Sequence, residues 1–258
     1  MEYKNIVVVG YPKSGTTWAS SLIAEVLQCP LVGDWGFDHL DADFKEGQDR
    51  DSEYRCYKSH HTLEAIYAAS PLTIHNIIYI IRDPRDIVIS GQHYFNFLPK
   101  PLSFLKDKKW GYLGKLARRI TTRFVTKKNK RRQMTEAVLY GNPNVNQWLA
   151  SKWSEHYQSY HKTGITIIKY EDLLAKPLKQ CKTICNALAI PVDEKHLKES
   201  IAKQAFDNKK EQVVAQQHTY LNKLIRKGKS GYWKTAFKPK LLKLFKKELS
   251  GAQDYYRF

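Results

Sequence analysis

The stretch that decides the fold lies at residues 7–18 and reads VVVGYPKSGTTW. An apolar run ends in a loop bounded by two glycines, and the loop leads into an amphipathic segment. Such a strand–loop–helix turn directs backbone N–H groups and a helix N-terminus toward one point, which suits a phosphate or another tetrahedral anion. The spacing is that of a nucleotide P-loop, but Thr16-Thr17 stands where an NTPase has Lys-Ser or Lys-Thr. The lysine lies inside the loop instead, at Lys13.

The composition is typical of a soluble globular protein. With 258 residues and 42% hydrophobic content, the chain is long enough to bury a full core, and one domain over 1–258 is expected. No apolar run reaches the roughly 18 residues of a membrane span, and the first strand starts too early for a secretory signal. The four cysteines lack zinc or redox spacing, and Cys181 and Cys185, one helical turn apart, fit a buried helix face. These features favour a reducing cytoplasm.

The net charge is less ordinary. The chain carries 43 Lys and Arg against 25 Asp and Glu, a formal charge of +18. Such a charge favours anionic ligands, which include a phosphorylated cofactor, an acidic substrate, nucleic acid and an anionic membrane. Composition alone does not choose among them.

Hydrophobic periodicity predicts alternating strands and helices. Strands are expected at residues 5–10, 54–58, 76–81 and 165–169. Helices are expected at residues 15–28, 62–69, 83–97, 145–161, 178–188, 193–203 and 239–249, and residues 31–52 are expected to form a loop. This order predicts an α/β fold, with a central and mainly parallel sheet flanked by helices and with ligands at the carboxyl ends of the strands.

Two further stretches are expected near the loop of Lys13. Arg82 leaves the end of a buried strand, and Ser90, two turns along the next helix, is placed to offer a hydroxyl to the same phosphate. The alternative is a helix that Asp83 caps, with solvated arginines. Lys58 and His60 follow another strand, and a histidine at that position, next to a phosphate loop, is a candidate general base.

The last basic motif lies near the C-terminus, where residues 226–234 read RKGKSGYWK. Its two glycines allow the backbone to approach a ligand closely, and its cations supply charge. A basic surface loop would have the same composition.

A basic amphipathic insert is expected at about residues 100–133. Within it, residues 106–132 interleave lysines and arginines with aliphatic and aromatic residues at helical spacing. One interpretation is a helix that packs on the domain and exposes its charged face. The other is a helix that docks on a membrane surface or an acidic ligand, or a lid over the acceptor site.

The ordered set of motifs resembles the PAPS-dependent sulfotransferase family, close to its cytosolic branch. Residues 11–18 match the family's 5′-phosphosulfate loop, and Arg82 with Ser90 matches its 3′-phosphate segment. Residues 226–234 match its R-K-G-x-x-G-D-W-K signature, with Tyr232 in place of the aspartate. Lys58-Ser59-His60 resembles the K-T-H segment that carries the base, and Tyr170-Glu171-Asp172 the Y-E-D segment.

The resemblance implies transfer of the sulfuryl group of PAPS, without a metal, to a hydroxyl or amine of a small-molecule acceptor. Catalysis of such an in-line displacement comes mainly from positioning and electrostatics. Lys13 would stabilise the bridging oxygen, Lys58 the transferring group, and His60 would take the acceptor proton. The remaining implied cofactor contacts are Ser14, Gly15, Thr16 and Thr17 at the 5′-phosphate, Arg82, Ser90, Arg226, Lys227 and Gly228 at the 3′-phosphate, and Trp18, Tyr170 and Phe206 around the adenine. For Phe206, packing in the core is the alternative.

Other functions fit the sequence less well. A P-loop kinase would need a lysine at position 16, where this chain has a threonine. A binding module for polyanions or membranes could use residues 106–132 on the same fold, but nucleic acid is not expected as a partner. His61 beside His60 is a second candidate for the base. The acceptor, including a lipid or a carbohydrate, and the oligomeric state stay open.

Overall fold

The computed structural model describes residues 2–36, 45–97, 125–161, 163–205, 207–209, 211, 228–251 and 256. Phe206, Arg226, Lys227 and most of the basic insert therefore lie outside the described residues. The contacts of the chain group into two compact units, the first formed by Met1–Arg82 and His156–Ser230, the second by Asp83–Glu155 and Gly231–Phe258. The single-domain boundary stays a prediction.

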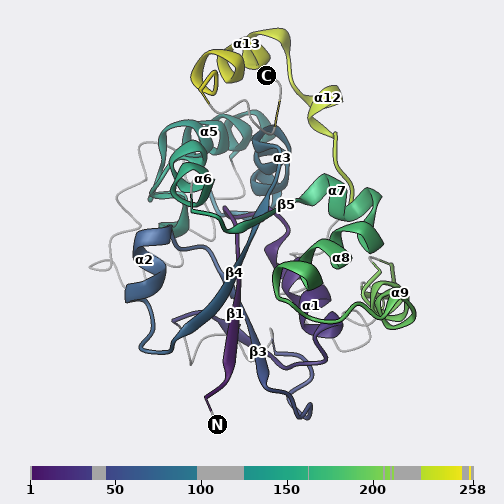
Figure 1. Cartoon of the computed structure of the whole chain (residues 1–258). Coiled ribbons are helices and arrows are strands. Elements are labelled where there is room, and N and C mark those ends of the chain that lie inside the picture. The colour runs from purple at the N-terminus through teal and green to yellow at the C-terminus, as the bar shows by residue number, and fades with distance from the viewer. Residues whose placement is uncertain are drawn as a thin grey trace. The chain divides into compact units, whose positions relative to one another are not determined.

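The first unit contains a five-stranded parallel sheet in the order β2-β3-β1-β4-β5 (Figure 1). Its strands are β1 (Lys4–Val9), β2 (Leu31–Asp34), β3 (Tyr54–Ser59), β4 (Ile74–Ile81) and β5 (Thr166–Lys169). Four of them lie where the periodicity predicts strands, and the predicted α/β class is confirmed. The expected loop at 31–52 is wrong at its start, because Leu31–Asp34 pairs with β3 as an edge strand.

Helices cover both faces of this sheet. They are α1 (Thr16–Val26), α2 (Leu63–Ala68), α6 (Trp153–His161, of which the part from His156 onward belongs to this unit), α7 (Tyr170–Ala175), α8 (Pro177–Ala187) and α9 (Glu194–Lys203). Successive residues of β4 face opposite sides, so Ile78 and Ile80 pack toward α1 and α8 whereas Tyr79 contacts the rings of α6.

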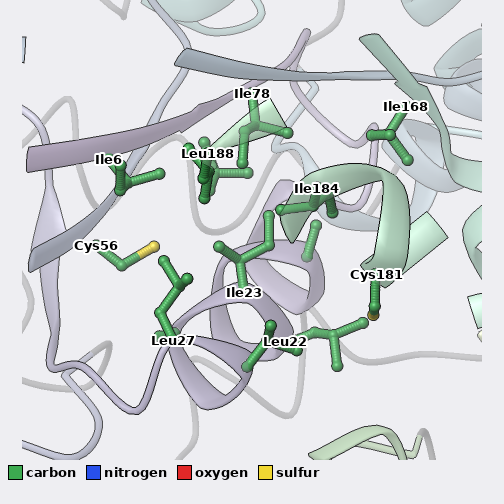
Figure 2. Close-up of a cluster of buried hydrophobic side chains, with 14 of the residues drawn as sticks. Ile6, Leu22, Ile23, Leu27, Cys56, Ile78, Ile168, Cys181, Ile184 and Leu188 are labelled. Atoms are coloured by element: carbon green, nitrogen blue, oxygen red, sulfur yellow. The ribbon is translucent and has the colours of Figure 1, made fainter. Parts of the chain in front are cut away.

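The core between the sheet and helices α1 and α8 is aliphatic (Figure 2). Ile6, Ile78 and Ile168 come from three neighbouring strands, and Ile23 and Ile184 come from the two helices. Burial of each such side chain contributes roughly 1.5–3 kcal/mol, so this cluster fixes α1 beneath the loop that precedes it. All four cysteines are buried free thiols, and Cys181 and Cys185 lie on the core face of α8, as expected.

The second unit is helical. It contains α3 (Pro84–Tyr94), α5 (Lys127–Tyr140), the short 3₁₀ helix η5 (Gln147–Leu149), α12 (Trp233–Ala236) and α13 (Pro239–Glu248). The predicted single helix at 145–161 is wrong, because the side chain of Asn146 accepts the N–H of Trp148 and closes a separate turn before α6 begins. Helix α5 begins inside the predicted basic insert, of which residues 125–133 are described.

Candidate anion and proton-transfer site

The loop between β1 and α1 has the geometry of an anion cradle. Gly10 leaves β1 where a Cβ would lie 2.6 Å from the carbonyl oxygen of Ile80, so no larger residue fits. Lys13 and Gly15 both adopt positive φ, 72° and 87°. Since a lysine pays a steric cost in that region, the loop is held in this conformation by its surroundings. Gly15 is the N-cap of α1, an 11-residue helix with a first turn of N–H donors.

One buried polar atom in this loop has no partner among the residues that the structure describes. The hydroxyl of Ser14 is fully buried and makes no hydrogen bond to any of them. A buried hydroxyl without a partner costs free energy, and an anion oxygen seated in the loop would supply the missing acceptor. Thr16 is buried and Thr17 is half-buried at the start of α1. The residues of the loop therefore fit a phosphate or a phosphosulfate.

Arg82 joins this loop to the C-terminal motif. Its guanidinium donates to the carbonyl oxygen of Lys13 at 3.0 Å and to that of Lys229 at 3.2 Å, and it stacks on the ring of Tyr170, 4.2 Å from the centroid. Its Nε is buried and makes no hydrogen bond within the described part of the chain. The motif thus reaches the loop through Lys229, beside Gly228, whose φ of 55° marks a tight turn.

Tyr170 forms one wall of the same site. A Cβ at Gly15 would lie 2.5 Å from the Tyr170 ring, and the indole of Trp18 meets that ring edge-on at 6.0 Å. The indole N–H of Trp18 donates to the carbonyl oxygen of Gln204 at 2.8 Å. Trp18, Tyr170 and Arg82 thus form a continuous aromatic and cationic surface beside the loop.

His60 lies directly against the loop, as the parallel pairing of β1 with β3 predicts. Its Nδ1 is 2.6 Å from the carbonyl oxygen of Gly10, which can only accept, so the proton is on Nδ1 and Nε2 is an acceptor. Burial first, and then the positive charges of Lys58 and Lys13, hold the pKa of His60 well below its usual range. The ring is therefore neutral at pH 7, as a general base must be.

His61 contacts Ser59 through two atoms. The hydroxyl oxygen of Ser59 accepts the main-chain N–H of His61 at 3.1 Å, and it lies 2.9 Å from Nδ1 of the same residue. A hydroxyl can donate to Nδ1 or accept from it, so this contact suits both tautomers of His61. Of the two neighbouring histidines, His60 is the one whose ring contact sets the tautomer.

Lys58 has a partner that no motif contains. Its ammonium lies 2.9 Å from Oδ1 of Asp34, with 5% of the lysine side chain and 21% of the aspartate side chain exposed. Asp34 ends β2, and it pairs in register with Lys58 across the strands. The sequence gives no sign of this pair, because the segment that carries Asp34 is predicted as loop.

A third histidine stands behind His60. His156 on α6 donates from Nε2 to the main-chain carbonyl oxygen of His60 at 3.0 Å, and its Nδ1 lies 2.9 Å from the hydroxyl of Tyr79. One sequence signal could have pointed to it, because His156 shares a helix face with Trp153 and Tyr160, and a buried histidine needs polar partners.

The start of α3 belongs to the second unit. The side chain of Asp83 caps α3 by accepting the main-chain N–H of Arg85, so the predicted cap is confirmed. Both carboxylate oxygens of Asp83 also accept hydrogen bonds from the Arg85 guanidinium. The expectation of solvated arginines is wrong, because Arg82 and Arg85 are both buried. Asp86 accepts the N–H groups of Gly231 and Trp233, which anchors the end of the C-terminal motif on α3. Ser90 is half-buried further along α3.

The family named "Sulfotransferase domain" matches this chain over residues 3–251. Among curated relatives, 3-alpha-hydroxysteroid sulfotransferase of Cavia porcellus is 23% identical over 91% of this chain and 78% of the relative. Sulfotransferase 2A1 of Homo sapiens is 21% identical, over 91% of this chain and 79% of the relative.

Two solved structures have the same fold. Mouse sulfotransferase SULT7A1 complexed with PAP has a TM-score of 0.63 and 21% identity, with 96% of this chain and 85% of that chain covered. Retinol dehydratase in complex with androsterone and the inactive cofactor PAP has a TM-score of 0.61 and 17% identity, with 100% and 83% covered. Since the family match spans nearly the whole chain, this protein belongs to the sulfotransferase domain family.

Proposed function

We propose that this protein is a PAPS-dependent sulfotransferase with a neutral histidine base. The observation that carries the proposal is the position of His60, whose Nδ1–H binds the carbonyl oxygen of Gly10 at the edge of the anion loop. A base and an anion cradle that share one backbone group are held in a fixed relation, which is what an in-line transfer between two bound molecules requires. When bound, PAPS would supply the sulfuryl group and leave as PAP.

Each residue then has one task. The N–H groups of the loop, Ser14 and the first turn of α1 would hold the 5′-phosphate, and Lys13 would neutralise charge at the bridging oxygen. Lys58, oriented by Asp34, would face the charge on the transferring group. Nε2 of His60 would accept the acceptor proton, since Nδ1 is already protonated.

The nucleoside side of the site is proposed on the same surface. Trp18 and Tyr170 offer rings for the adenine, and Arg82 offers charge for the 3′-phosphate, with Gly228 beside it. Ser90, Arg226, Lys227 and Phe206 are proposed to complete this part of the site.

The acceptor is proposed to carry a hydroxyl group or an amine. Relatives are named for hydroxysteroids, and a related structure holds androsterone, so hydroxylated apolar molecules are the first class to try. We also propose, from the sequence, that the acceptor could be a lipid or a carbohydrate. A second proposal from the sequence is contact with a membrane or an acidic ligand through residues 106–132. The described helices include none long and apolar enough to cross a membrane.

The test combines cofactor binding with transfer. We expect PAP to raise the melting temperature more than 5′-AMP or Mg-ATP does, and labelled PAPS to label at least one member of a panel of steroid, phenol, amine and sugar acceptors. Lys13→Ala and His60→Ala should each lower kcat by at least about 100-fold, while His60→Ala keeps its PAP affinity. Lys4→Ala is the matched control, because the exposed Lys4–Glu53 pair lies at the opposite end of β1. Mg-ATP binding tighter than PAP binding, or full activity in both variants, would sink the proposal.

A further inference from the structure

His156 is held at both ring nitrogens. It is fully buried, its Nε2–H donates to the carbonyl oxygen of His60, and its Nδ1 accepts the hydroxyl proton of Tyr79. Because the carbonyl oxygen only accepts, this is the tautomer that the two contacts require. The ring is neutral, and neither its orientation nor its protonation can change without the loss of a buried hydrogen bond.

The surroundings of His156 are aromatic. Its ring meets Tyr11 edge-on at 5.6 Å and lies 5.7 Å from Tyr79 and 5.8 Å from Tyr160. Burial lowers the pKa of His156 to about 4, against the opposing effect of hydrogen bonds to the backbone of His60 and His61. A histidine in such a place does not titrate near pH 7 and has no path to solvent, so a proton shuttle is a poor explanation for it.

A single chain of hydrogen bonds runs from the middle of the sheet to the candidate base. The hydroxyl of Tyr79 on β4 donates to His156 on α6, His156 donates to the carbonyl oxygen of His60, and Nδ1 of His60 donates to the carbonyl oxygen of Gly10 after β1. His60 is therefore fixed at its main chain and at its ring by two different elements. A ring fixed in this way can turn neither about its side-chain bonds nor with its own backbone.

We propose that His156 is the positioning residue of the base: it holds the main chain of His60 so that the ring keeps its proton on Nδ1 and directs Nε2 to the acceptor. The inference rests on the proposed function, since it assigns a partner to the base of that reaction. His156 acts through His60 and touches neither the cofactor nor the acceptor. Its loss should therefore lower turnover and leave the affinity for PAP unchanged.

The first test needs neither cofactor nor acceptor. Long-range proton–nitrogen NMR spectra report which nitrogen of His60 is protonated and at which pH the ring titrates. In the wild type we expect Nδ1–H and titration well below pH 6.5, with Lys58, Lys13 and His156 as the groups that face His60. In His156→Phe both lysines remain, but the freed main chain lets water reach the ring, so we expect mixed tautomers and a higher pKa for His60.

The second test is kinetic. His156→Phe should lower kcat by about tenfold or more, with the KM for PAPS and the affinity for PAP within about twofold of the wild type. His156→Gln, whose side-chain amide can replace the Nε2–H donor, should recover most of that loss. Tyr79→Phe removes the donor to Nδ1 together with the hydrogen bond of the Tyr79 hydroxyl to the backbone of Tyr11, and it should lower turnover in the same direction. When His60 is already replaced by alanine, adding His156→Phe should not lower kcat any further.

The control for a merely structural role is Asn5→Ala. Its side-chain amide also donates to a backbone carbonyl oxygen, that of Thr73 at 2.8 Å, but at the far end of β1. If His156→Phe loses stability and activity in the same ratio as Asn5→Ala, or leaves the tautomer and pKa of His60 as in the wild type, the inference is wrong. Failure of the wild type to transfer a sulfuryl group would instead count against the proposed function, since the NMR result does not depend on transfer.

Discussion

The ammonium of Lys58 lies 2.9 Å from a carboxylate oxygen of Asp34, at the edge of a site built to hold an anion. A negative charge at that place weakens anion binding unless it serves another purpose. The pair is largely buried, so it neutralises and orients Lys58 before any ligand arrives. Under the proposed function, the cofactor anion and Asp34 would share one cation.

Removal of that carboxylate gives the first prediction. Asp34→Asn should lower the free energy of unfolding by about 1–3 kcal/mol, because a largely buried ammonium loses its counter-charge. PAP should then raise the melting temperature by more than it does in the wild type, because the bound anion supplies the missing charge. Differential scanning fluorimetry with and without PAP measures both effects. Glu53→Gln, which breaks an exposed ion pair, is the control and should change neither. An equal or smaller PAP shift in Asp34→Asn would contradict this explanation.

The second prediction concerns the glycine that caps α1. Gly15→Ala should lower the free energy of unfolding by about 1–2 kcal/mol because of the positive φ, and further because the added carbon displaces the Tyr170 ring. The displaced ring should also weaken PAP binding. Gly164→Ala has a comparable φ of 75° and nothing within 4 Å of the added carbon, so it isolates the backbone cost. Chemical denaturation should give a clearly lower free energy of unfolding for Gly15→Ala than for Gly164→Ala. Equal losses, with PAP affinity retained in both, would mean that the ring does not press on the loop.

The third prediction concerns the shape of Arg82. Arg82→Lys keeps the charge but cannot donate to two carbonyl oxygens while stacking on Tyr170. We expect PAP affinity, measured by calorimetry, to fall at least about tenfold, which corresponds to about 1.4 kcal/mol. Arg55→Lys is a matched control, since that guanidinium stacks on the exposed ring of Tyr3. Wild-type PAP affinity in Arg82→Lys would show that charge alone is enough.

The fourth prediction is the pH dependence of stability. Burial lowers the pKa of His156 to about 4 and that of His60 well below 6.5, so the folded state disfavours their protonation. Above pH 6.5 both histidines are neutral in the folded and unfolded states, so they do not lower the free energy of unfolding. That free energy falls as the pH drops toward the folded pKa values, and His156 alone accounts for a loss of roughly 3 kcal/mol by pH 4. Urea denaturation at a series of pH values measures it.

A carboxylate with a lowered pKa acts in a different window. The pKa of Glu194, paired with Lys182 and Lys198, is about 2, so its contribution is lost only below pH 4.5. His156→Phe should therefore flatten the decline between pH 6.5 and 4 and leave the lower part unchanged. An unchanged decline in that variant would show that His156 binds protons equally well in the native and unfolded states.

Much of the fold could be predicted because its central strands are short apolar runs and its loop is bounded by glycines. Strand β2 could not, since Leu31–Asp34 has too little periodicity to stand out and becomes a strand only by pairing with β3. The predicted helix at 145–161 is split for a local reason, because the Asn146 side chain accepts the N–H of Trp148 and starts a separate 3₁₀ turn.

The site divides in the same way. The placement of Lys58 and His60 beside the loop could be predicted, because adjacent parallel strands bring their carboxyl ends together. The partners of these residues could not: Asp34, the carbonyl oxygen of Gly10 and His156 come from other elements, and no local spacing relates them to the residues they hold. Sequence patterns identified groups that carry charge or protons, whereas the groups that fix tautomer and orientation became visible only in three dimensions.

The four interior cysteines have a practical consequence. Burial raises the pKa of Cys29 and of Cys181 to about 12, and it raises those of Cys56 and Cys185 as well, so each side chain is both shielded and protonated at neutral pH. Maleimides and other alkylating reagents need an accessible thiolate. A single cysteine introduced on the surface should therefore accept a fluorophore while the native four stay unlabelled. The rate at which the native four become labelled would report the rate at which the core opens.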